Sequence, residues 1–207
     1  MILKNFVVFE GIDGAGTSTQ IKMLQNRTDA EKFFFTAEPT KSETGKFLRK
    51  MLKGDVKLDA RTSAFLFAAD RSEHLYGKGE DSALVEKAES GKIVVSDRYL
   101  FSNIAYQSVT CGEELPKLLN SVFPLPEILF FFEINPELSL KRVDSRGERE
   151  IYEQIDYLKK TESQYEKVIS EYESKNTGMK IVRIDASKSI EEVYGQICVN
   201  LKEKYGR

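Results

Sequence analysis

The sequence predicts an α/β fold in which a doubly wound parallel sheet of about five strands carries helices on both faces. Two observations support this fold class. Short apolar runs rich in β-branched and aromatic residues recur along the chain, and longer stretches with helical periodicity separate them. The length of 207 residues is typical of one domain, which we expect to span 1–207.

The expected strands are apolar without alternation, which is typical of strands buried on both faces of a sheet. They cover 6–9, 33–36, 93–95, 128–132 and 181–184. In such sheets, ligands bind beyond the carboxyl ends of the strands. We therefore expect the polar groups that follow the first three strands to surround one crevice, whereas the last two mark only where the polar surface begins. These groups are Glu10, Glu38, Asp97, Glu133 and Asp185.

Helical patterns fill the segments between the strands. A charged stretch, 148–176, places its apolar residues along one side, which predicts an amphipathic helix that covers the sheet. The expected helices cover 17–27, 43–53, 60–76, 80–90, 102–109, 136–144, 150–175 and 189–204.

Charge and cysteine content exclude several classes of protein. The 31 basic and 33 acidic residues leave a net charge of −2, which argues against a general nucleic-acid binder. Cys111 and Cys198 are too few for a disulfide framework or a zinc site, so we expect a reducing compartment. No run approaches the roughly 20 apolar residues that span a bilayer. These features predict a cytoplasmic protein with no membrane partner.

A glycine-rich turn joins the first expected strand to the first expected helix. There, backbone N–H groups can converge on an anion, and the helix N-terminus adds partial positive charge. The template G-x-x-x-x-G-K-[ST] is matched at Gly11, Gly16 and Ser18, so the sequence predicts a fold of the P-loop NTPase type that binds ATP. The nucleotide-binding candidates are Gly11, Ile12, Asp13, Gly14, Ala15, Gly16, Thr17, Ser18 and Thr19.

Thr17 stands where the template has lysine. Threonine donates a hydrogen bond but brings no cation to the β- and γ-phosphates. Loss of one preorganised donor typically costs about 3 kcal/mol of transition-state stabilisation. Lys22 lies five residues further on, which is about 500° of helical rotation, so we expect the missing charge to come from another segment. The alternative is a glycine-rich turn that binds nothing.

A second set of polar residues follows the third expected strand. Asp97 can hold Mg²⁺ together with Ser18, and the forked guanidinium of Arg98 suits a phosphate. Asn103, Tyr106 and Gln107 are three or four residues apart and share a helix face that can read a base and a sugar. Alone, such a face is also typical of a polar helix surface.

The helix 60–76 adds an aromatic ring and a guanidinium four residues apart. Phe67 can stack on a base while Arg71 binds a phosphate. Without the other motifs, we would assign Phe67 to the core and Arg71 to the surface. We expect a packing or surface role for His74, which has no second histidine nearby.

Taken in order along nearly the whole chain, these motifs resemble those of the thymidylate kinases. The resemblance implies transfer of the ATP γ-phosphate to dTMP with Mg²⁺, in a homodimer. The matching segments are Phe9-Glu10-Gly11-Ile12-Asp13-Gly14-Ala15-Gly16, Glu38-Pro39, Leu66-Phe67-Ala68-Ala69-Asp70-Arg71, Asp97-Arg98-Tyr99 with Ser102, Ala105-Tyr106-Gln107 and Ile184-Asp185-Ala186-Ser187.

The resemblance also implies a role for each matching residue. Asp13 would sit near the sugar and the reacting phosphates, and Phe67 would stack on thymine. Arg49, Arg71 and Arg98 would hold the dTMP phosphate. Asn103 and Gln107 would contact the base, and Tyr106 would crowd the 2′ position of the sugar. The family's mobile lid would cover 141–153, with Lys141, Arg142, Arg146, Arg149 and Tyr152.

Thr17, Ala37 and the lid sequence depart from the family pattern. Our hypothesis is that Arg146 or Arg149 supplies the charge missing at Thr17 when the lid closes; the alternative is a solvated charge cluster. Two other functions stay open: a binding protein with weakened catalysis, and a kinase for another deoxynucleoside or deoxynucleotide. The candidate catalytic residues are Asp13, Asp97, Arg98, Arg146 and Arg149.

Overall fold

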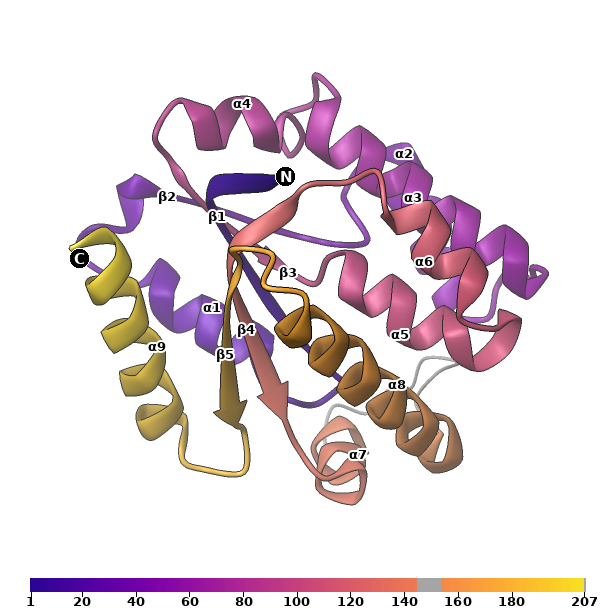
Figure 1. Ribbon diagram of the computed structural model, residues 1–207. Helices are drawn as coiled ribbons and strands as arrows, with labels where there is room; N and C mark the ends of the chain where they lie inside the picture. The colour runs from indigo at the N-terminus through magenta and orange to yellow at the C-terminus, as the bar shows by residue number, and fades with distance from the viewer. Residues whose placement is uncertain (145–153, 207) are drawn as a thin grey trace.

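The computed structural model describes residues 1–144 and 154–206 and contains one parallel sheet of five strands (Figure 1). The strand order is β2-β3-β1-β4-β5. Each neighbouring pair is parallel, which confirms the predicted fold class. The strands are β1 (Ile2–Gly11), β2 (Phe33–Ala37), β3 (Ile93–Asp97), β4 (Leu125–Glu133) and β5 (Lys180–Asp185).

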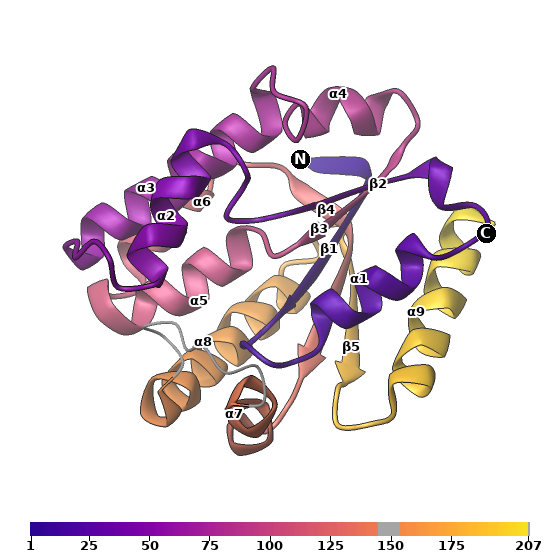
Figure 2. The same ribbon diagram turned by 180° about the vertical axis from the view of Figure 1, so that it is seen from behind.

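Helices cover both faces of the sheet, with α1 and α9 on one side and α5 and α8 on the other (Figures 1 and 2). A short 3₁₀ segment, Ala30–Lys32, precedes β2. The α-helices are α1 (Thr17–Gln25), α2 (Glu43–Leu52), α3 (Ala60–Tyr76), α4 (Leu84–Glu89), α5 (Leu100–Cys111), α6 (Glu114–Asn120), α7 (Pro136–Asp144), α8 (Ile155–Ser174) and α9 (Ile190–Tyr205).

Three expected helix starts were wrong, and one helix was not expected. Helix α8 begins at Ile155 rather than near 150, because Gln154 before it has an extended backbone. Helix α4 begins at Leu84 rather than near 80, because Ala83 adopts a left-handed backbone with φ of 60°. Helix α5 begins two residues earlier than expected, at Leu100. The pattern gave no signal for α6, which is seven residues long and contains Pro116 within its first turn.

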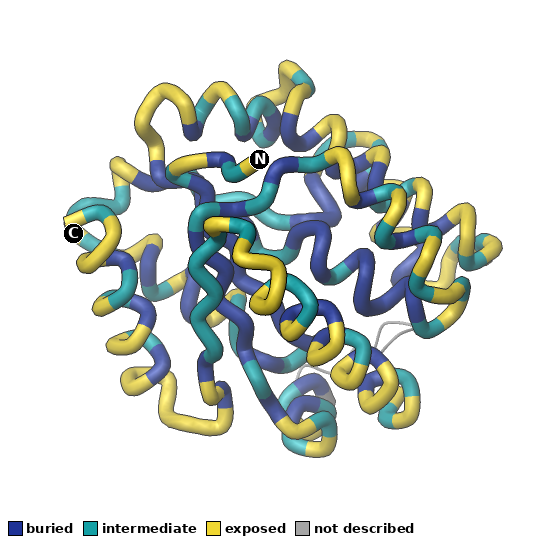
Figure 3. Tube along the Cα trace, in the orientation of Figure 1, coloured by how far each residue is buried: buried dark blue, intermediate teal, exposed yellow. Residues whose placement is uncertain are grey.

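The core lies between the sheet and its helices, where the central strands are fully enclosed (Figure 3). Phe6, Val7, Val8 and Phe9 of β1 have no exposed surface, as expected for a strand buried on both faces. The edge strands β2 and β5 are mostly half-buried. Tyr165 of α8 is also fully buried, which confirms that this amphipathic helix covers the sheet.

The carboxyl ends of the strands share one edge of the sheet, toward which the arrowheads of β4 and β5 point in Figure 1. In the register of the central pair, Phe9 lies opposite Asp97, and the Arg98 amide donates to the Phe9 carbonyl at 2.9 Å. The turn after β1 and the residues after β3 are therefore neighbours. Within the described residues, no helix is long and apolar enough to cross a membrane.

Candidate active site

The turn between β1 and α1 has a backbone that requires its glycines. Gly14 and Gly16 have φ of 81° and 97°, a region that L side chains rarely adopt. A Cβ on Gly14 would lie 2.5 Å from the Ser139 carbonyl oxygen, so this residue also needs the absence of a side chain. The strand, the turn and the helix therefore form the arrangement that the phosphate-loop motif predicts.

Ser18 and Asp97 meet at the edge of this turn. The Ser18 hydroxyl donates to Oδ2 of Asp97 at 2.5 Å. The other carboxylate oxygen, Oδ1, is buried and has no hydrogen-bond partner among the described residues. A hydroxyl and an unsatisfied carboxylate oxygen are hard ligands of the kind that Mg²⁺ binds.

Arg98 connects the phosphate loop to α5. Its Nη1 donates to the Gly11 carbonyl at 3.0 Å and to the Ser102 hydroxyl at 3.1 Å, and its Nη2 forms an ion pair with Asp13. Burial acts to lower the pKa of Arg98, but nearby acidic groups, including Tyr106 and Asp13, raise it well above its usual value overall. The guanidinium is thus charged and held in place next to the loop.

Asp13 is held by two side chains. Besides the ion pair with Arg98, its Oδ2 accepts a hydrogen bond from the Tyr106 hydroxyl at 2.7 Å. The Asp13 amide donates back to the same hydroxyl at 3.1 Å. Burial raises the pKa of Tyr106 well above its usual value, so this phenol stays protonated and keeps donating.

Glu10 lies beneath these groups without solvent contact. Its Oε1 accepts from the amides of Tyr99 and Ser102 at 2.8 and 3.1 Å. Its Oε2 accepts from the hydroxyls of Ser102 and Tyr165 at 2.5 and 2.8 Å. Burial raises the pKa of Glu10 from its ordinary 4.5 to about 7, although these hydrogen bonds and Arg98 act in the opposite direction.

The raised pKa predicts a specific pH dependence of stability. Between pH 4.5 and about 7, folded Glu10 holds a proton that the unfolded chain has lost, so folding stability falls as pH rises through this window. Across the whole window, the free energy of unfolding falls by about 3 kcal/mol. We expect Glu10→Gln, which keeps the size of the side chain, to remove this fall in denaturant unfolding measured across the window.

A control for this prediction is Glu127→Gln. Burial acts to raise the pKa of Glu127, but hydrogen bonds, the largest from Lys204, lower it overall. Its stabilising effect is therefore lost only as pH falls through its lowered pKa, below the Glu10 window. An unchanged slope in Glu10→Gln would show that another group titrates there.

One cavity of about 380 Å³ opens beside Arg98, and every residue expected to bind the substrate lines it. It lies between α2, α3 and α5 and the ends of β2 and β3, so five separate segments of the chain contribute to it. The predicted residues that line it are Asp13, Ser18, Arg49, Phe67, Arg71, Asp97, Arg98, Asn103, Tyr106 and Gln107. We call it the acceptor cavity.

A second cavity of about 550 Å³ lies over the phosphate loop, and we call it the donor cavity. Ile12 to Thr19 line it, whereas Gly11 does not. From the sequence we rejected Lys22 as a source of the missing charge and placed Arg142 only in the lid, yet both line this cavity, and we missed Lys188, Ile190 and Val193. The closing segment Ile184-Asp185-Ala186-Ser187 was the only sequence signal near the last three. The two cavities share Asp13, Ser18, Asp97 and Arg98.

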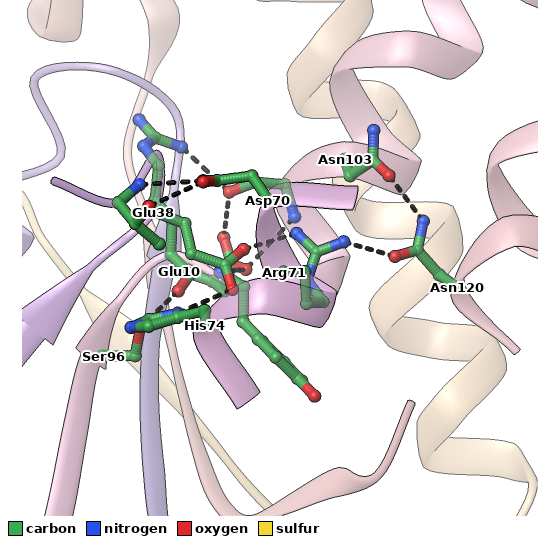
Figure 4. Close-up of polar contacts among 12 residues, drawn as sticks. Glu10, Glu38, Asp70, Arg71, His74, Ser96, Asn103 and Asn120 are labelled. Carbon is green, nitrogen blue, oxygen red and sulfur yellow. Dashed lines mark hydrogen bonds and ion pairs between the residues drawn. The ribbon is translucent and has the colours of Figure 1, made fainter. Parts of the chain in front are cut away.

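Arg71 lines the acceptor cavity and belongs to a buried polar network (Figure 4). Its Nη2 donates to Glu38 at 2.5 Å and its Nη1 to Asn120, also at 2.5 Å. His74 lies 3.1 Å from the other Glu38 oxygen and 2.6 Å from the Thr36 hydroxyl. His74 is therefore a fully buried packing residue, and the surface alternative was wrong.

Asp70, next to Arg71, fastens the segment before α2 to α3. It accepts from the Thr40 amide at 2.8 Å and from the Thr40 and Thr44 hydroxyls at 2.6 and 2.7 Å. This anchor positions α2, which carries Arg49 into the acceptor cavity. The Arg49 guanidinium also donates to the Pro39 carbonyl, next to the cis Glu38–Pro39 bond.

Several buried polar atoms of residues that line this cavity have no hydrogen-bond partner within the described part of the chain. They are Arg71 Nε, Asn103 Nδ2 and Gln107 Oε1. All three residues line the acceptor cavity. Because an unpaired buried polar atom is destabilising, these atoms mark where a polar ligand edge would bind.

Other expected residues lie elsewhere. Glu133 pairs with Arg183 at 2.6 Å, and Asp185 accepts from Ser187, so both serve local structure, as expected. Lys141 and Arg142 lie on α7, and Arg142 lines the donor cavity. The remaining lid candidates, Arg146, Arg149 and Tyr152, lie outside the described residues.

Comparisons with known proteins agree with this geometry. The family model described as thymidylate kinase matches residues 9–197. A putative thymidylate kinase of Treponema pallidum is 40% identical over 98% of this chain and 97% of its own. A probable thymidylate kinase of Methanocaldococcus jannaschii is 40% identical, with 98% of each chain covered. A thymidylate kinase of Leptospira borgpetersenii is 36% identical over 95% of this chain and 92% of its own. The chain therefore belongs to the thymidylate kinase family.

Proposed function

We propose that the protein transfers the γ-phosphate of ATP to dTMP, which gives dTDP. The observation that carries this proposal is the pair of adjoining cavities, one over a phosphate loop and one lined by the side chains expected to bind a base and a phosphate. Asp13, Ser18, Asp97 and Arg98 line both, so the phosphates of two bound nucleotides would meet there. Phosphoryl transfer depends on this positioning and on electrostatic stabilisation.

ATP would bind with its phosphates on the backbone amides of the loop and on the N-terminus of α1. Three cationic side chains, Lys22, Arg142 and Lys188, line the same cavity and can offset the charge missing at Thr17. From its position on the helix, we expected Lys22 to be a poor substitute for a lysine at position 17, but its long side chain lines the donor cavity. Arg146 and Arg149 remain candidates for the same role.

dTMP would lie in the acceptor cavity with its phosphate toward Arg49 and Arg98. Phe67 would stack on thymine, and Tyr106 would crowd the 2′ position. The unpaired Gln107 Oε1 can accept from thymine N3–H, and the unpaired Asn103 Nδ2 can donate to thymine O4. Both terminal nitrogens of Arg71 are bonded to Glu38 and Asn120, which favours a role at the base end over phosphate binding.

The residues present fit a magnesium ion. Ser18 Oγ and the unsatisfied Oδ1 of Asp97 would hold it, directly or through water. Residues 1–144 and 154–206 contain no group of three or more His, Cys, Asp or Glu side chains arranged to hold a metal. Phosphate oxygens and water would therefore complete the coordination shell. When bound, the ion would neutralise charge on the transferring phosphates.

Asp13 and Arg98 would then act together in the transfer. Arg98 brings a fixed positive charge to the place where the two phosphates meet, so little reorganisation accompanies the reaction. Asp13 holds that guanidinium through the ion pair, and its own carboxylate is oriented by Tyr106.

A coupled assay of ADP release tests the proposed function. We expect a rate that depends on dTMP and saturates with it. A rate no higher with dTMP than without it would contradict the proposal. Thr17 supports a second function, a nucleotide-binding protein with weak catalysis. That function predicts saturable dTMP binding in calorimetry without ATP turnover, and robust turnover would exclude it.

We also propose that the protein forms a homodimer through α3. The exposed residues of this helix, spaced three or four apart, include Phe65 and Tyr76, which are 51% and 56% exposed. Ala69 and Ser72 lie between them on the same face, Thr62 lies one turn before Phe65, and all three are small enough for close approach. The two cysteines are free, consistent with the cytoplasmic location that we also propose.

The dimer proposal predicts that Phe65→Asp gives a monomer. A charge on this face would be desolvated without a partner in the dimer. Sedimentation or light scattering measures the change in mass. Val199→Asp on α9 is the control, because Val199 is 66% exposed and lies on a different helix. A wild-type monomer, or a dimeric Phe65→Asp, would contradict the proposal.

A further inference from the structure

Three buried side chains form a chain of hydrogen bonds at the base end of the acceptor cavity (Figure 4). Arg71 Nη1 donates to Asn120 Oδ1 at 2.5 Å, and Asn120 Nδ2 donates to Asn103 Oδ1 at 2.7 Å. Arg71, Asn103 and Asn120 are only 1%, 2% and 2% exposed. Asn120 ends α6 and does not line the cavity, so it acts through its neighbours.

The direction of this chain is fixed by its first member. A guanidinium only donates, so the Asn120 atom that faces Arg71 must be the oxygen. The Asn120 nitrogen then faces two acceptors, Asn103 Oδ1 and the Pro116 carbonyl, the latter at 2.8 Å. Asn103 must therefore turn its oxygen toward Asn120. Its nitrogen points away from Asn120 in Figure 4 and has no partner among the described residues.

We propose that Asn120 is a positioning residue that sets the base preference of the acceptor cavity. By holding the Asn103 oxygen, Asn120 makes Asn103 present a hydrogen-bond donor to the base. This inference rests on the proposed function and deepens it. The site then favours a pyrimidine with an oxygen at position 4 and disfavours one with an amino group there.

The chemistry of the two pyrimidine edges explains this preference. Thymine and uracil offer an acceptor at O4 and a donor at N3–H, which complement Asn103 Nδ2 and Gln107 Oε1. Cytosine offers a donor at N4 and an acceptor at N3, so each contact would join two donors or two acceptors. Because the groups are buried, the mismatch leaves them without partners.

The test is Asn120→Asp in the full-length enzyme. A carboxylate at this position accepts from Arg71 but cannot donate to Asn103, so the Asn103 amide must turn and present its oxygen to the base. We expect kcat/KM for dTMP to fall by about 10- to 100-fold, mostly through KM. For dCMP it should rise or stay unchanged. The ratio of dTMP to dUMP should not change, since both carry O4.

A matched control is Asn200→Asp. Asn200 Nδ2 donates to the carbonyl four residues earlier at 2.9 Å, as Asn120 does, but on α9 away from both cavities. We expect it to leave both substrate ratios unchanged. In an Asn103→Ala background, Asn120→Asp should cause no further change in the ratio of dTMP to dCMP, because the side chain through which it acts is gone.

Asn103→Asp provides a second variant that does not disturb Asn120. Its carboxylate accepts from Asn120 and presents an oxygen to the base, so the ratio of dTMP to dCMP should shift in the same direction. An unchanged ratio in folded Asn120→Asp, or in Asn103→Asp if the first does not fold, would overturn the inference. A wild type that turns over no dTMP would instead refute the proposed function; base preference is then measured by calorimetric binding of the three monophosphates.

Discussion

Arg98→Ala is expected to lower kcat by about a thousandfold, a larger loss than we expect from any other single substitution in either cavity. The guanidinium lies where the donor and acceptor cavities meet and is fixed by Asp13 and by the Gly11 carbonyl. Its removal takes away a preorganised positive charge and leaves Asp13 without its cationic partner. Steady-state kinetics with saturating ATP and dTMP measures the loss.

Arg27→Ala is the matched control for this prediction. Arg27 also forms an ion pair with an aspartate, Asp29, and its side chain is 21% exposed against 22% for Arg98. It lines neither cavity. We expect its kcat to stay within about twofold of wild type, because Arg27 would contact neither bound nucleotide. Equal losses in both variants would mean that Arg98 matters only for folding.

Thr17→Lys is expected to raise turnover. Thr17 lines the donor cavity at the place where the phosphate-loop template has lysine, so the new ammonium would reach the β- and γ-phosphates. A preorganised cation there is worth up to about a hundredfold in rate. The gain in rate will be smaller if Lys22, Arg142 or Lys188 already supplies part of the positive charge that is missing at Thr17. Paired kcat and KM values for ATP measure it.

Thr19→Lys tests whether the added charge must be at position 17 or has the same effect elsewhere in the donor cavity. Thr19 lines the same cavity but lies two residues further into α1. We expect this variant to leave kcat unchanged or lower it. A fall in turnover on Thr17→Lys would contradict the account of the loop, since it would mean that threonine belongs to a differently arranged phosphate site.

Much of the fold could be predicted because the signals are local. The continuous apolar runs of β1 and β4 and the periodicity of α3 and α8 are readable from neighbouring residues, and each formed the expected element. The register that places Phe9 beside Asp97 is not local, but parallel topology alone was enough to bring the strand ends together. Helix α6 was missed because a short helix with an early proline has no periodic signal.

The candidate site was predictable where it consists of motifs and unpredictable where it consists of contacts between distant segments. Asp13, Arg98 and Gln107 carry recognisable chemistry at motif positions. Asn120 looks like any asparagine until α6 packs beside α3 and α5, and nothing local distinguishes it. The contribution of α9 to the donor cavity depends likewise on how that helix packs against α1.

The most direct test of the two-cavity account is an initial-velocity study in which ATP and dTMP are varied together. If both nucleotides are bound at once and their phosphates meet at Asp13 and Arg98, the double-reciprocal lines intersect, because a ternary complex forms before transfer. Parallel lines would mean that the phosphate passes through a covalent enzyme intermediate. That result would contradict the account, because adjoining cavities would then have no role in direct transfer.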